Sequence, residues 1–420
     1  MSRAPTSELA AELAEPTLDR LIRYARIDTQ SRRDATELPS TPGQWELLEL
    51  LRSELFALGL EQVELDEKGF LFATLPANVP DAETIGLLAH VDTSPDAPGS
   101  VVEPLVHRDY DGGRIELPRG GAALDPETMP ELRAKLGHDL VSSSGDTLLG
   151  ADDKAGIAEI MSAVAHLVAD PALPRPTLRI GFTSDEETGA QNALELDIER
   201  FGARCAYTLD GSELGELQTE TFNAAEVVLR IRGVDVHPGH ACGKLVNATR
   251  IAGRILSDLP AEQTPERSSG REGFIHVHEL EGTAGEAMLR AIVRDFDRDG
   301  LERGVALLRE TAERAVAAEP RASLEVEVRP QYPNMREFLD RDPRIAAAAE
   351  EAIRREGIDP RFVPVRGGTD GAILSQRGLP TPNIFTGGHE FHSVREWASV
   401  DDMASAAAVC VRLAGVWAEA

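Results

Sequence analysis

The segment TIGLLAHVDTSPD, residues 84–96, decides the fold of this chain. Its apolar part is continuous rather than alternating, which is typical of a strand buried on both faces of a parallel sheet. The run stops at His90 and Asp92, two residues apart, so both side chains point to the same face. The segment therefore predicts a parallel α/β sheet with polar side chains at the carboxyl ends of its strands, the edge where such sheets bind ligands.

Four other segments follow the same plan of an apolar stretch, a turn and a His, Asp or Glu. They are LLGADDKAG (148–156) with Asp152, GFTSDEETG (181–189) with Glu186 and Glu187, AYTLDGS (206–212) with Asp210, and GGHEFHS (387–393) with His392. Because a parallel sheet collects its strand ends along one edge, we expect these side chains to converge. Two imidazoles and three carboxylates offer the mixed nitrogen and oxygen ligands of zinc or a close relative.

Helices and strands alternate around these segments. The spacing of apolar residues predicts helices over about 16–27, 44–58, 343–356 and 401–418, and another that begins at Ala151. Strands are expected at 62–66 and 70–75, and in the runs TLRIGFT and CAYTLD. Strands that alternate with helices predict an α/β fold with a doubly wound, mostly parallel sheet.

The pattern changes near Phe222. The runs AEVVLRIRGV, GFIHVHELEG, AMLRAIVRDFD and SLEVEVRP read as short strands, and helices are expected near 247–259 and 299–318. This combination predicts a smaller α+β domain whose sheet is covered on one face. After Pro333 the α/β pattern returns. We therefore expect a main domain formed by residues 1–220 and 333–420, interrupted by an inserted domain at 221–332.

Composition narrows the classes of partner. The 420 residues exceed what one hydrophobic core usually organises, and the net charge is −29. Such a charge argues against nucleic acid and against anionic membranes, and it is most simply an acidic shell that keeps the protein soluble. Three widely separated cysteines suit a reducing compartment, and no signal peptide or membrane span is visible. We expect a cytoplasmic protein.

A structural explanation competes with each candidate ligand. His90 could bind metal through one ring nitrogen while Asp92 accepts a hydrogen bond from the other, and the buried strand before them favours this over a chance loop pair. Asp152 and Asp153 precede a helix, where Asp is a common cap. We assign the ligand to Asp152, whose two oxygens could bridge two ions, and the cap to Asp153. Asp210 could be a simple turn residue.

Two other choices stay open on spacing alone. Glu186 and Glu187 are adjacent, so their side chains diverge, and one ligand with one general acid or base is the natural division. Asp185 belongs to the same acidic turn, and we expect it to be merely exposed. His389 and His392 both follow a Gly-Gly pair, and either could supply the last ligand.

The chain resembles the tripeptide aminopeptidases, a branch of the di-zinc peptidases that also include aminoacylases and dimerising carboxypeptidases. The resemblance runs from LDRLIRYARIDTQS (18–31) to the C-terminal helix, and its most specific motifs are HVDTSPD, GADDKAG and RGGTDGA. One departure is SDEET, where the family has Pro before Asp185 and Val after Glu187. Neither position supplies a functional side chain.

The resemblance implies two Zn2+ per subunit. His90, Asp152 and Asp210 would hold one ion, and Asp152, Glu187 and His392 the other. The final ligand of the family is the histidine four residues after the Gly-Gly pair, which selects His392.

The resemblance also implies roles for side chains that do not bind the metals. Asp92 would orient His90, and Glu186 would be the general base. The inserted domain would act as a lid and dimerisation domain, and His237 would polarise the scissile carbonyl, in its own subunit or across a homodimer. Arg294 and Arg366 would be candidates for the terminal carboxylate of the substrate, because a guanidinium binds that group in a bidentate way.

The implied activity is that of a metal-dependent aminopeptidase that releases the N-terminal residue from tripeptides. A hydroxide activated by two zinc ions would attack the peptide, with small peptides as the partners. Related dipeptidases, carboxypeptidases and N-acyl amino acid hydrolases need the same metals, so the scaffold does not separate them. A requirement for a free amino group would identify an aminopeptidase.

Overall fold

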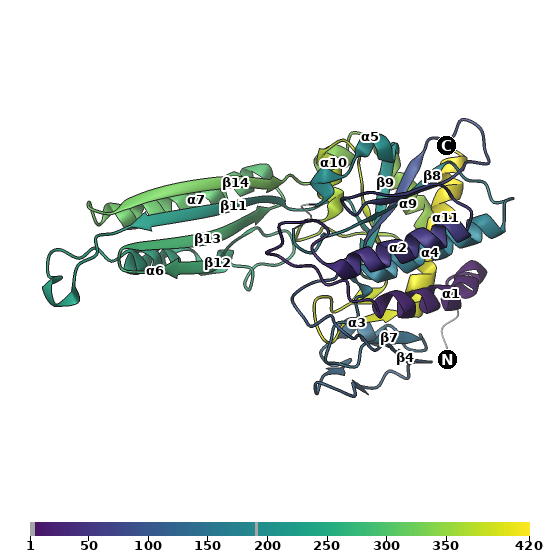
Figure 1. Ribbon diagram of the computed structural model, residues 1–420, viewed down its shortest axis with the longest axis horizontal. Helices are drawn as coiled ribbons and strands as arrows, with labels where there is room; N and C mark the ends of the chain where they lie inside the picture. The colour runs from purple at the N-terminus through teal and green to yellow at the C-terminus, as the bar shows by residue number, and fades with distance from the viewer. Residues whose placement is uncertain (1–4, 190–191) are drawn as a thin grey trace. The chain divides into compact units, whose positions relative to one another are not determined.

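The computed structural model describes residues 5–189 and 192–420 (Figure 1). The chain divides into two compact units. The larger comprises residues 1–219, 338–363 and 369–420, and the smaller comprises residues 220–337 and 364–368. The short return of the chain at 364–368 to the smaller unit has no counterpart in the sequence pattern.

Within its described residues, the larger unit is built on an eight-stranded mixed sheet in the order β1-β2-β8-β3-β9-β16-β10-β15. The four central strands are β8 (Leu178–Thr183), β3 (Ile85–His90), β9 (Cys205–Gly211) and β16 (Asn383–Phe385). Neighbours among these four are parallel. The flanking strands are β1 (Glu61–Leu65), β2 (Leu71–Leu75), β10 (Glu216–Gln218) and β15 (Arg361–Phe362). Antiparallel pairs join β1 to β2, β2 to β8 and β10 to β16, so the parallel core predicted from the sequence is confirmed within a mixed sheet.

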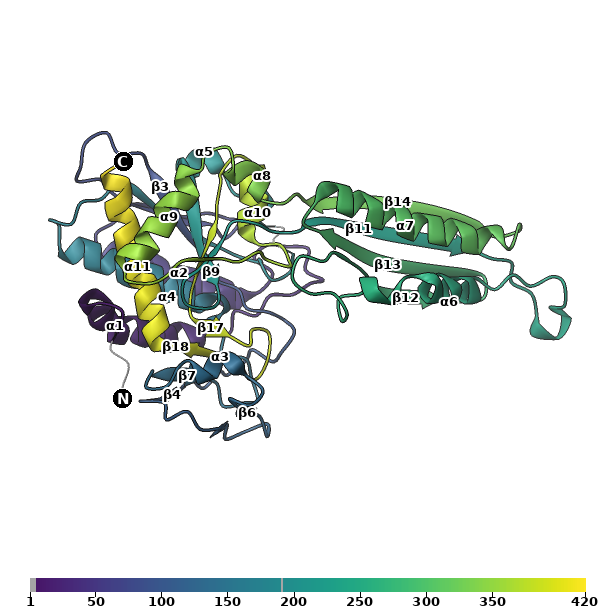
Figure 2. The same cartoon turned by 180° about the vertical axis from the view of Figure 1, so that it is seen from behind.

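Helices cover this sheet (Figures 1 and 2). They are α1 (Glu8–Ala25), α2 (Pro42–Ala57), α4 (Ala151–Ala169), α9 (Arg344–Arg355), α10 (Asp370–Gln376) and α11 (Val400–Ala418). Helix α4 packs on β3 and β9, and α1 and α11 pack beside it. It forms because Ile157, Ile160, Met161 and Val164 recur at helical spacing, and all four are buried. None of the helices among the described residues is long and apolar enough to cross a membrane.

Residues 97–147 form an additional layer for which the sequence made no prediction. They contribute β4 (Leu105–His107), β5 (Ile115–Glu116), β6 (Ala123–Leu124), α3 (Pro130–Arg133) and β7 (Leu140–Ser142). Strands β4 and β7 join β17 (Gly388–His389) and β18 (Trp397–Ser399) in a second sheet of this unit. This sheet fixes the segment between β17 and β18, which contains His392.

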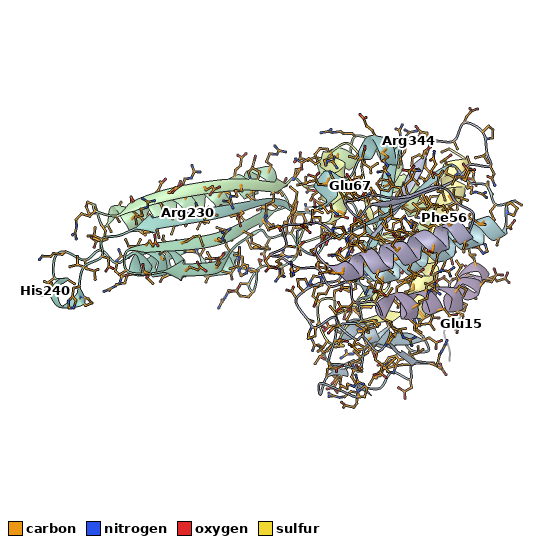
Figure 3. The ribbon with its side chains drawn as sticks, viewed as in Figure 1. Glu15, Phe56, Glu67, Arg230, His240 and Arg344 are labelled. Atoms are coloured by element: carbon orange, nitrogen blue, oxygen red, sulfur yellow. The ribbon has the colours of Figure 1, made fainter. Side chains whose placement is uncertain are left out.

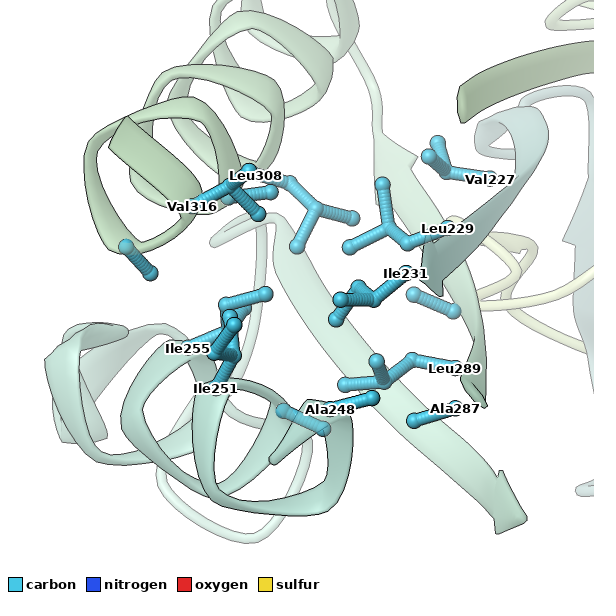
Figure 4. Close-up of a cluster of buried hydrophobic side chains, with 14 of the residues drawn as sticks. Val227, Leu229, Ile231, Ala248, Ile251, Ile255, Ala287, Leu289, Leu308 and Val316 are labelled. Carbon is cyan, nitrogen blue, oxygen red and sulfur yellow. The ribbon is translucent and has the colours of Figure 1, made fainter. Parts of the chain in front are cut away.

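The smaller unit is an antiparallel sheet in the order β12-β13-β11-β14, with two helices on one face. Its elements are β11 (Asn223–Arg232), α6 (Ala248–Asp258), β12 (Phe274–Gly282), β13 (Glu286–Asp295), α7 (Arg298–Ala317) and β14 (Ser323–Tyr332). Figure 4 shows the core between them, where Leu229 and Ile231 of β11 meet Ile255 of α6 and Leu308 of α7. The predicted α+β composition of this region is confirmed.

The other face of that sheet is polar. Along β11, Leu229 and Ile231 face the helices, whereas Arg230, labelled in Figure 3, lies on the opposite face. Its guanidinium lies 3.0 Å from the carboxylate of Glu327 on the neighbouring β14. The alternation explains why these strands read as half-exposed in the sequence.

Candidate active site

The strand ends of the larger unit bring the predicted ligands together. His90 is the last residue of β3, Asp210 lies near the end of β9, and Asp152 is the second residue of α4. Glu186 and Glu187 follow β8, and His392 follows β17. This arrangement follows from the parallel core, because the carboxyl ends of β3, β8 and β9 share one edge of the sheet.

The carboxylate of Asp152 lies between two imidazoles. Its Oδ1 is 3.1 Å from His90 Nε2, and its Oδ2 is 3.3 Å from His392 Nε2. Each oxygen therefore faces a different histidine. A carboxylate in this position can bridge two metal ions, one beside each imidazole.

One further carboxylate accompanies each histidine. Glu187 Oε2 is 2.9 Å from His392 Nε2, and Asp210 Oδ1 is 3.8 Å from His90 Nε2. Glu187 is 5% exposed, and its Oε1 is buried without a hydrogen-bond partner among the described residues. A buried carboxylate oxygen with no donor is costly unless a cation satisfies it.

These separations suit divalent metal binding. Zinc binds imidazole nitrogen and carboxylate oxygen at roughly 2.0–2.2 Å, so two ligand atoms of one tetrahedral ion lie about 3.4 Å apart. The contacts of Asp152 and Glu187 with the histidines are close to that value. The donor set, two imidazoles with carboxylates, also suits zinc better than magnesium or calcium.

Asp153 lies near His90 and Asp210 as well, and one of its oxygens, a ring nitrogen of His90 and an oxygen of Asp210 lie within 4.8 Å of one another, close enough to share an ion. Its carboxylate is already engaged, however. Oδ2 accepts the backbone N–H of His90, and Oδ1 accepts that of Gly156 one turn into α4. Asp153 therefore orients the start of the helix and the end of β3, while Asp152 faces the imidazoles.

Asp92 links two of the strand ends. His90 Nδ1 lies 3.0 Å from the backbone carbonyl of Asp92 and 3.3 Å from its Oδ1. The carboxylate also accepts the backbone N–H groups of Glu186 and Glu187, at 2.9 and 3.1 Å. Asp92 thus holds the ring of His90 and the backbone of the acidic turn in a fixed relation. The second contact was not anticipated from the sequence.

The cluster brings several carboxylates close together and partly out of water, and this raises the pKa of several of them. Burial and the negative charge of neighbouring carboxylates raise the pKa of Glu186 and of Asp210 well above the usual range. Burial and Asp152 raise the pKa of Glu187 to about 7. Hydrogen bonds to Asp152 and Glu187 raise the pKa of His392 to about 11. Without a cation between them, these carboxylates therefore bind protons that a metal would displace.

His389 and His392 occupy different surroundings. The ring of His389 is buried and stacked on Trp397 at 4.1 Å, and its Nε2 is 3.8 Å from Glu213. The Nζ atom of Lys135 lies 2.5 Å from Glu213 and 2.6 Å from Asp402, the other acid near this histidine. An ammonium group already neutralises these acids, so the His389 cluster is a poor metal site. His392 is the histidine that faces Asp152 and Glu187.

The three predicted substrate residues lie in the smaller unit. His237 is exposed, and its Nδ1 accepts the backbone N–H of Gly239, which leaves the ring proton on Nε2. Arg294 is half-buried over the ring of Tyr332, at 5.3 Å, and no carboxylate among the described residues pairs with it. Arg366 is tied down by hydrogen bonds to the segment 268–272.

Among the buried acids that sequence reasoning missed, three lie beside residues of the site. Asp185, expected to be exposed, is buried and accepts hydrogen bonds from Ser40 and Gln44. Asp370 of the RGGTDGA motif accepts a hydrogen bond from Thr183 Oγ1, at 2.8 Å. Glu396 accepts three backbone N–H groups from the loop that ends at Asp152. Asp185 and Asp370 lie in motifs that the sequence analysis quoted, whereas Glu396 lies in none.

The partners of Asp185 and Glu396 explain why no local signal found them. Ser40 is 145 positions from Asp185 in the sequence. The loop residues that contact Glu396 precede it by 244 to 247 positions. Contacts of this length leave no periodic pattern in the sequence. Asp185 also adopts a positive φ of 57°, which turns its side chain inward.

Comparisons with known proteins identify the family of the chain. Residues 148–415 match the family model described as "Peptidase family M20/M25/M40". Peptidase T of Escherichia fergusonii is 46% identical over 404 residues, covering 96% of this chain and 98% of that protein. Peptidase T of Vibrio parahaemolyticus is 45% identical over 403 residues, with the same shares of the two chains covered.

Solved structures give the same result. The chain is similar to the aminopeptidase PepT from Bacillus cereus, with a TM-score of 0.75, 26% identity, and coverage of 96% of this chain and 99% of that one. A tripeptidase from Staphylococcus aureus shares the fold, with a TM-score of 0.77, 21% identity, and coverage of 97% and 99%. These matches show that the chain belongs to the metal-dependent peptidases of family M20/M25/M40, and the cluster of candidate metal ligands at the strand ends is consistent with that family.

Proposed function

We propose that this chain is an aminopeptidase that removes the N-terminal residue from tripeptides and holds two zinc ions per subunit. The observation that carries the proposal is the Asp152 carboxylate, each of whose oxygens faces a different imidazole. Its relatives called Peptidase T, which are 44–46% identical over 94–96% of this chain, support the substrate class.

The proposed ligand sets share Asp152. His90 and Asp210 complete one set, and Glu187 and His392 complete the other, in agreement with the short distances from Asp152 and Glu187 to the imidazoles. These residues would hold zinc, and a bound zinc ion would supply Lewis acidity that lowers the pKa of a bound water to ~7.

Glu186 is the proposed general base. Its backbone is held by Asp92, while no described residue forms a hydrogen bond with its carboxylate. The carboxylate is thus free to accept a proton from the attacking water and to hand it to the amine that leaves when the peptide bond breaks. Burial and neighbouring acids raise its pKa, which suits a group that must first accept and then donate a proton.

His237, Arg294 and Arg366 are proposed to bind the substrate. The Nε2–H group of His237 is a donor suited to the oxygen of the scissile carbonyl as it gains negative charge. Arg294 lacks a described carboxylate partner, so it is the freer receptor for the terminal carboxylate of a peptide, whereas Arg366 keeps fewer donors unused. Arg294→Lys should therefore raise KM for a tripeptide by about tenfold, and Arg366→Lys by less.

The setting of the enzyme is part of the proposal. Cys205, Cys242 and Cys410 are free thiols and Cys242 is exposed, which supports a reducing, cytoplasmic location. A homodimer formed through the smaller unit is proposed from the family resemblance. Light scattering of the purified protein tests it, and a monomeric mass would refute the dimer.

One experiment tests the proposed function directly. The purified protein is analysed for metal and then incubated with a free tripeptide, its N-acetylated form and a dipeptide. We expect two zinc ions per chain and release of the first residue from the free tripeptide alone. Preference for the dipeptide, cleavage at the C-terminus or release of acetate would assign the scaffold to a dipeptidase, a carboxypeptidase or an N-acyl amino acid hydrolase instead. Asp152→Ala is the control, because loss of the shared ligand should remove both ions.

A further inference from the structure

Glu396 is a buried carboxylate with no role in the proposed mechanism. It lies four residues after His392, immediately before β18, and is 1% exposed. Its Oε2 accepts the backbone N–H groups of Leu149 and Gly150, at 2.8 and 2.7 Å. Its Oε1 accepts the backbone N–H of Asp152 at 3.0 Å. All three N–H groups that the Glu396 carboxylate accepts therefore belong to one short loop, residues 149–152.

The burial of this charge needs an explanation. No Lys or Arg among the described residues lies within ion-pair distance of Glu396. The buried ammonium group of Lys154 interacts with it electrostatically from farther away, and the three N–H groups contact it directly. Hydrogen bonds from neutral donors to a carboxylate are among the stronger ones, but burying an unpaired acid still costs free energy. Packing alone would be served equally well by an uncharged side chain. The geometry thus indicates a local requirement for two acceptor oxygens.

The loop that Glu396 holds is the one that presents Asp152. Gly150 adopts a φ of 80°, in the left-handed region, and this turn directs the N–H groups of Leu149, Gly150 and Asp152 toward the same carboxylate. With its backbone N–H fixed, Asp152 has little freedom beyond its own side-chain rotation. Its two oxygens then stay directed at the two imidazoles.

We propose that Glu396 is a positioning residue for metal binding: it fixes the backbone of Asp152 so that one carboxylate can serve both ions. The inference rests on the proposed function, because it assumes that Asp152 is the shared ligand. The same short segment, residues 392–396, thus carries one ligand and the anchor of another. Movement of this segment would disturb both halves of the centre together.

The test is Glu396→Gln in the full-length protein, with zinc affinity of the metal-free chain measured by competition with a chelator. An amide has one acceptor oxygen and one donor nitrogen. In Glu396→Gln the nitrogen would therefore face either the N–H of Asp152 or the N–H groups of Leu149 and Gly150, and a donor cannot accept a hydrogen bond from another donor. We expect zinc affinity to fall by ~10–100-fold, the usual effect of losing a partner of a metal ligand. When cobalt is substituted for zinc, the visible absorption of the ion should change as well.

Glu356→Gln is the matched control. Glu356 is also 1% exposed, lies in the same unit, and accepts hydrogen bonds from Thr6 Oγ1, Ser7 Oγ and Arg412 Nε. Its removal should lower the melting temperature in a similar way and leave zinc affinity unchanged. Equal loss of zinc affinity in both variants would overturn the inference, because the loss would then reflect general destabilisation.

The remaining outcomes are also decisive. Wild-type zinc affinity in Glu396→Gln would overturn the inference alone, while the proposed function would survive. Absence of zinc binding by the unaltered protein would overturn both. If Glu396→Gln does not fold, Glu396→Asp keeps the charge but withdraws the oxygens by one methylene, and the same loss of affinity is expected; wild-type affinity in that variant would again overturn the inference.

Discussion

Both units contain clusters of acidic residues, but the clusters differ in whether Lys or Arg side chains pair with the acids. On the open face of the smaller sheet, Glu226 lies 3.0 Å from Arg329, and Glu327 lies 3.0 Å from Arg230. At the strand ends of the larger unit, Glu186 and Asp210 are partly buried, with no Lys or Arg beside them among the described residues. One group of acids is neutralised by its own neighbours, and the other is left for an external cation.

The difference shows that the role of an acidic residue depends on its burial and on the charges beside it. Exposed ion pairs contribute little to stability because water already solvates both charges. Buried carboxylates that repel one another hold free energy that a metal ion can release when it binds. An acidic run in the sequence therefore says little until its partners are known.

The largest effect is expected when the two adjacent acids after β8, Glu186 and Glu187, are substituted one at a time. Glu186→Ala should lower kcat by roughly 10^2–10^4, because proton transfer is lost, while zinc content stays near wild type. Glu187→Ala should instead lose zinc. Kinetics and metal analysis of the two variants check this, and zinc loss in Glu186→Ala would show that base and ligand have been exchanged.

Removing the metal should come next in size and should affect the larger unit. A ligand that binds only the folded state stabilises it by about 4 kcal/mol at a concentration 1000-fold above Kd. Dialysis against a chelator is therefore expected to lower the melting temperature by several degrees, and zinc, rather than magnesium, should restore it. An unchanged melting temperature would mean that the strand-end acids tolerate one another without a cation.

A smaller and pH-dependent effect is expected at Glu159 of α4, a buried acid with no partner among the described residues. Burial, together with Asp153 and Asp402, raises its pKa well above the usual range. Its contribution to stability is therefore fully present below the pKa of the unfolded chain and is lost as pH rises toward the folded value. Glu159→Gln should leave the free energy of unfolding nearly unchanged at pH 5 and stabilise the protein at pH 8, by up to about 1.4 kcal/mol per pH unit.

Melting temperatures across that pH range test this, with exposed Glu12→Gln on α1 as the control. A gain of equal size at pH 5 and pH 8 would contradict the assignment, because it would not depend on ionisation.

The smallest effect is expected on the open face of the smaller sheet. Glu226→Gln removes contacts with Arg290 and Arg329, at 3.5 and 3.0 Å, on a polar face. The change in the free energy of unfolding should be about 0–1 kcal/mol and should shrink further in high salt. A loss of stability as large as the one expected on metal removal would contradict the proposed difference between the two groups of acids.

The strand-end residues could be found in the sequence because each follows a continuous apolar run. The runs before His90, Glu186 and Asp210 became the parallel strands β3, β8 and β9. Likewise, the alternating runs of residues 223–332 became the smaller sheet. Period and turn chemistry are local, and local signals carried these predictions.

Other features were decided by packing. The first helix was expected to begin at Pro16, yet α1 starts at Glu8 and continues through that proline, with Ala10, Leu13 and Leu18 buried. The core contacts of the first two turns outweigh the hydrogen bond that proline cannot donate. The anchoring roles of Asp185 and Glu396 depend on partners far away in the sequence, so no window of residues could have disclosed them.

The position of β16 has a consequence for how the protein is made. This strand lies between β9 and β10, although the residues of the smaller unit separate it from both in the chain. On the ribosome, the smaller unit is therefore complete while β9 still presents an open edge, the kind of edge that invites aggregation. We expect a nascent chain halted at residue 380 to resist protease in the smaller unit only and to recruit chaperones to the rest; protection of both units at that length would show that the sheet closes without its last central strand.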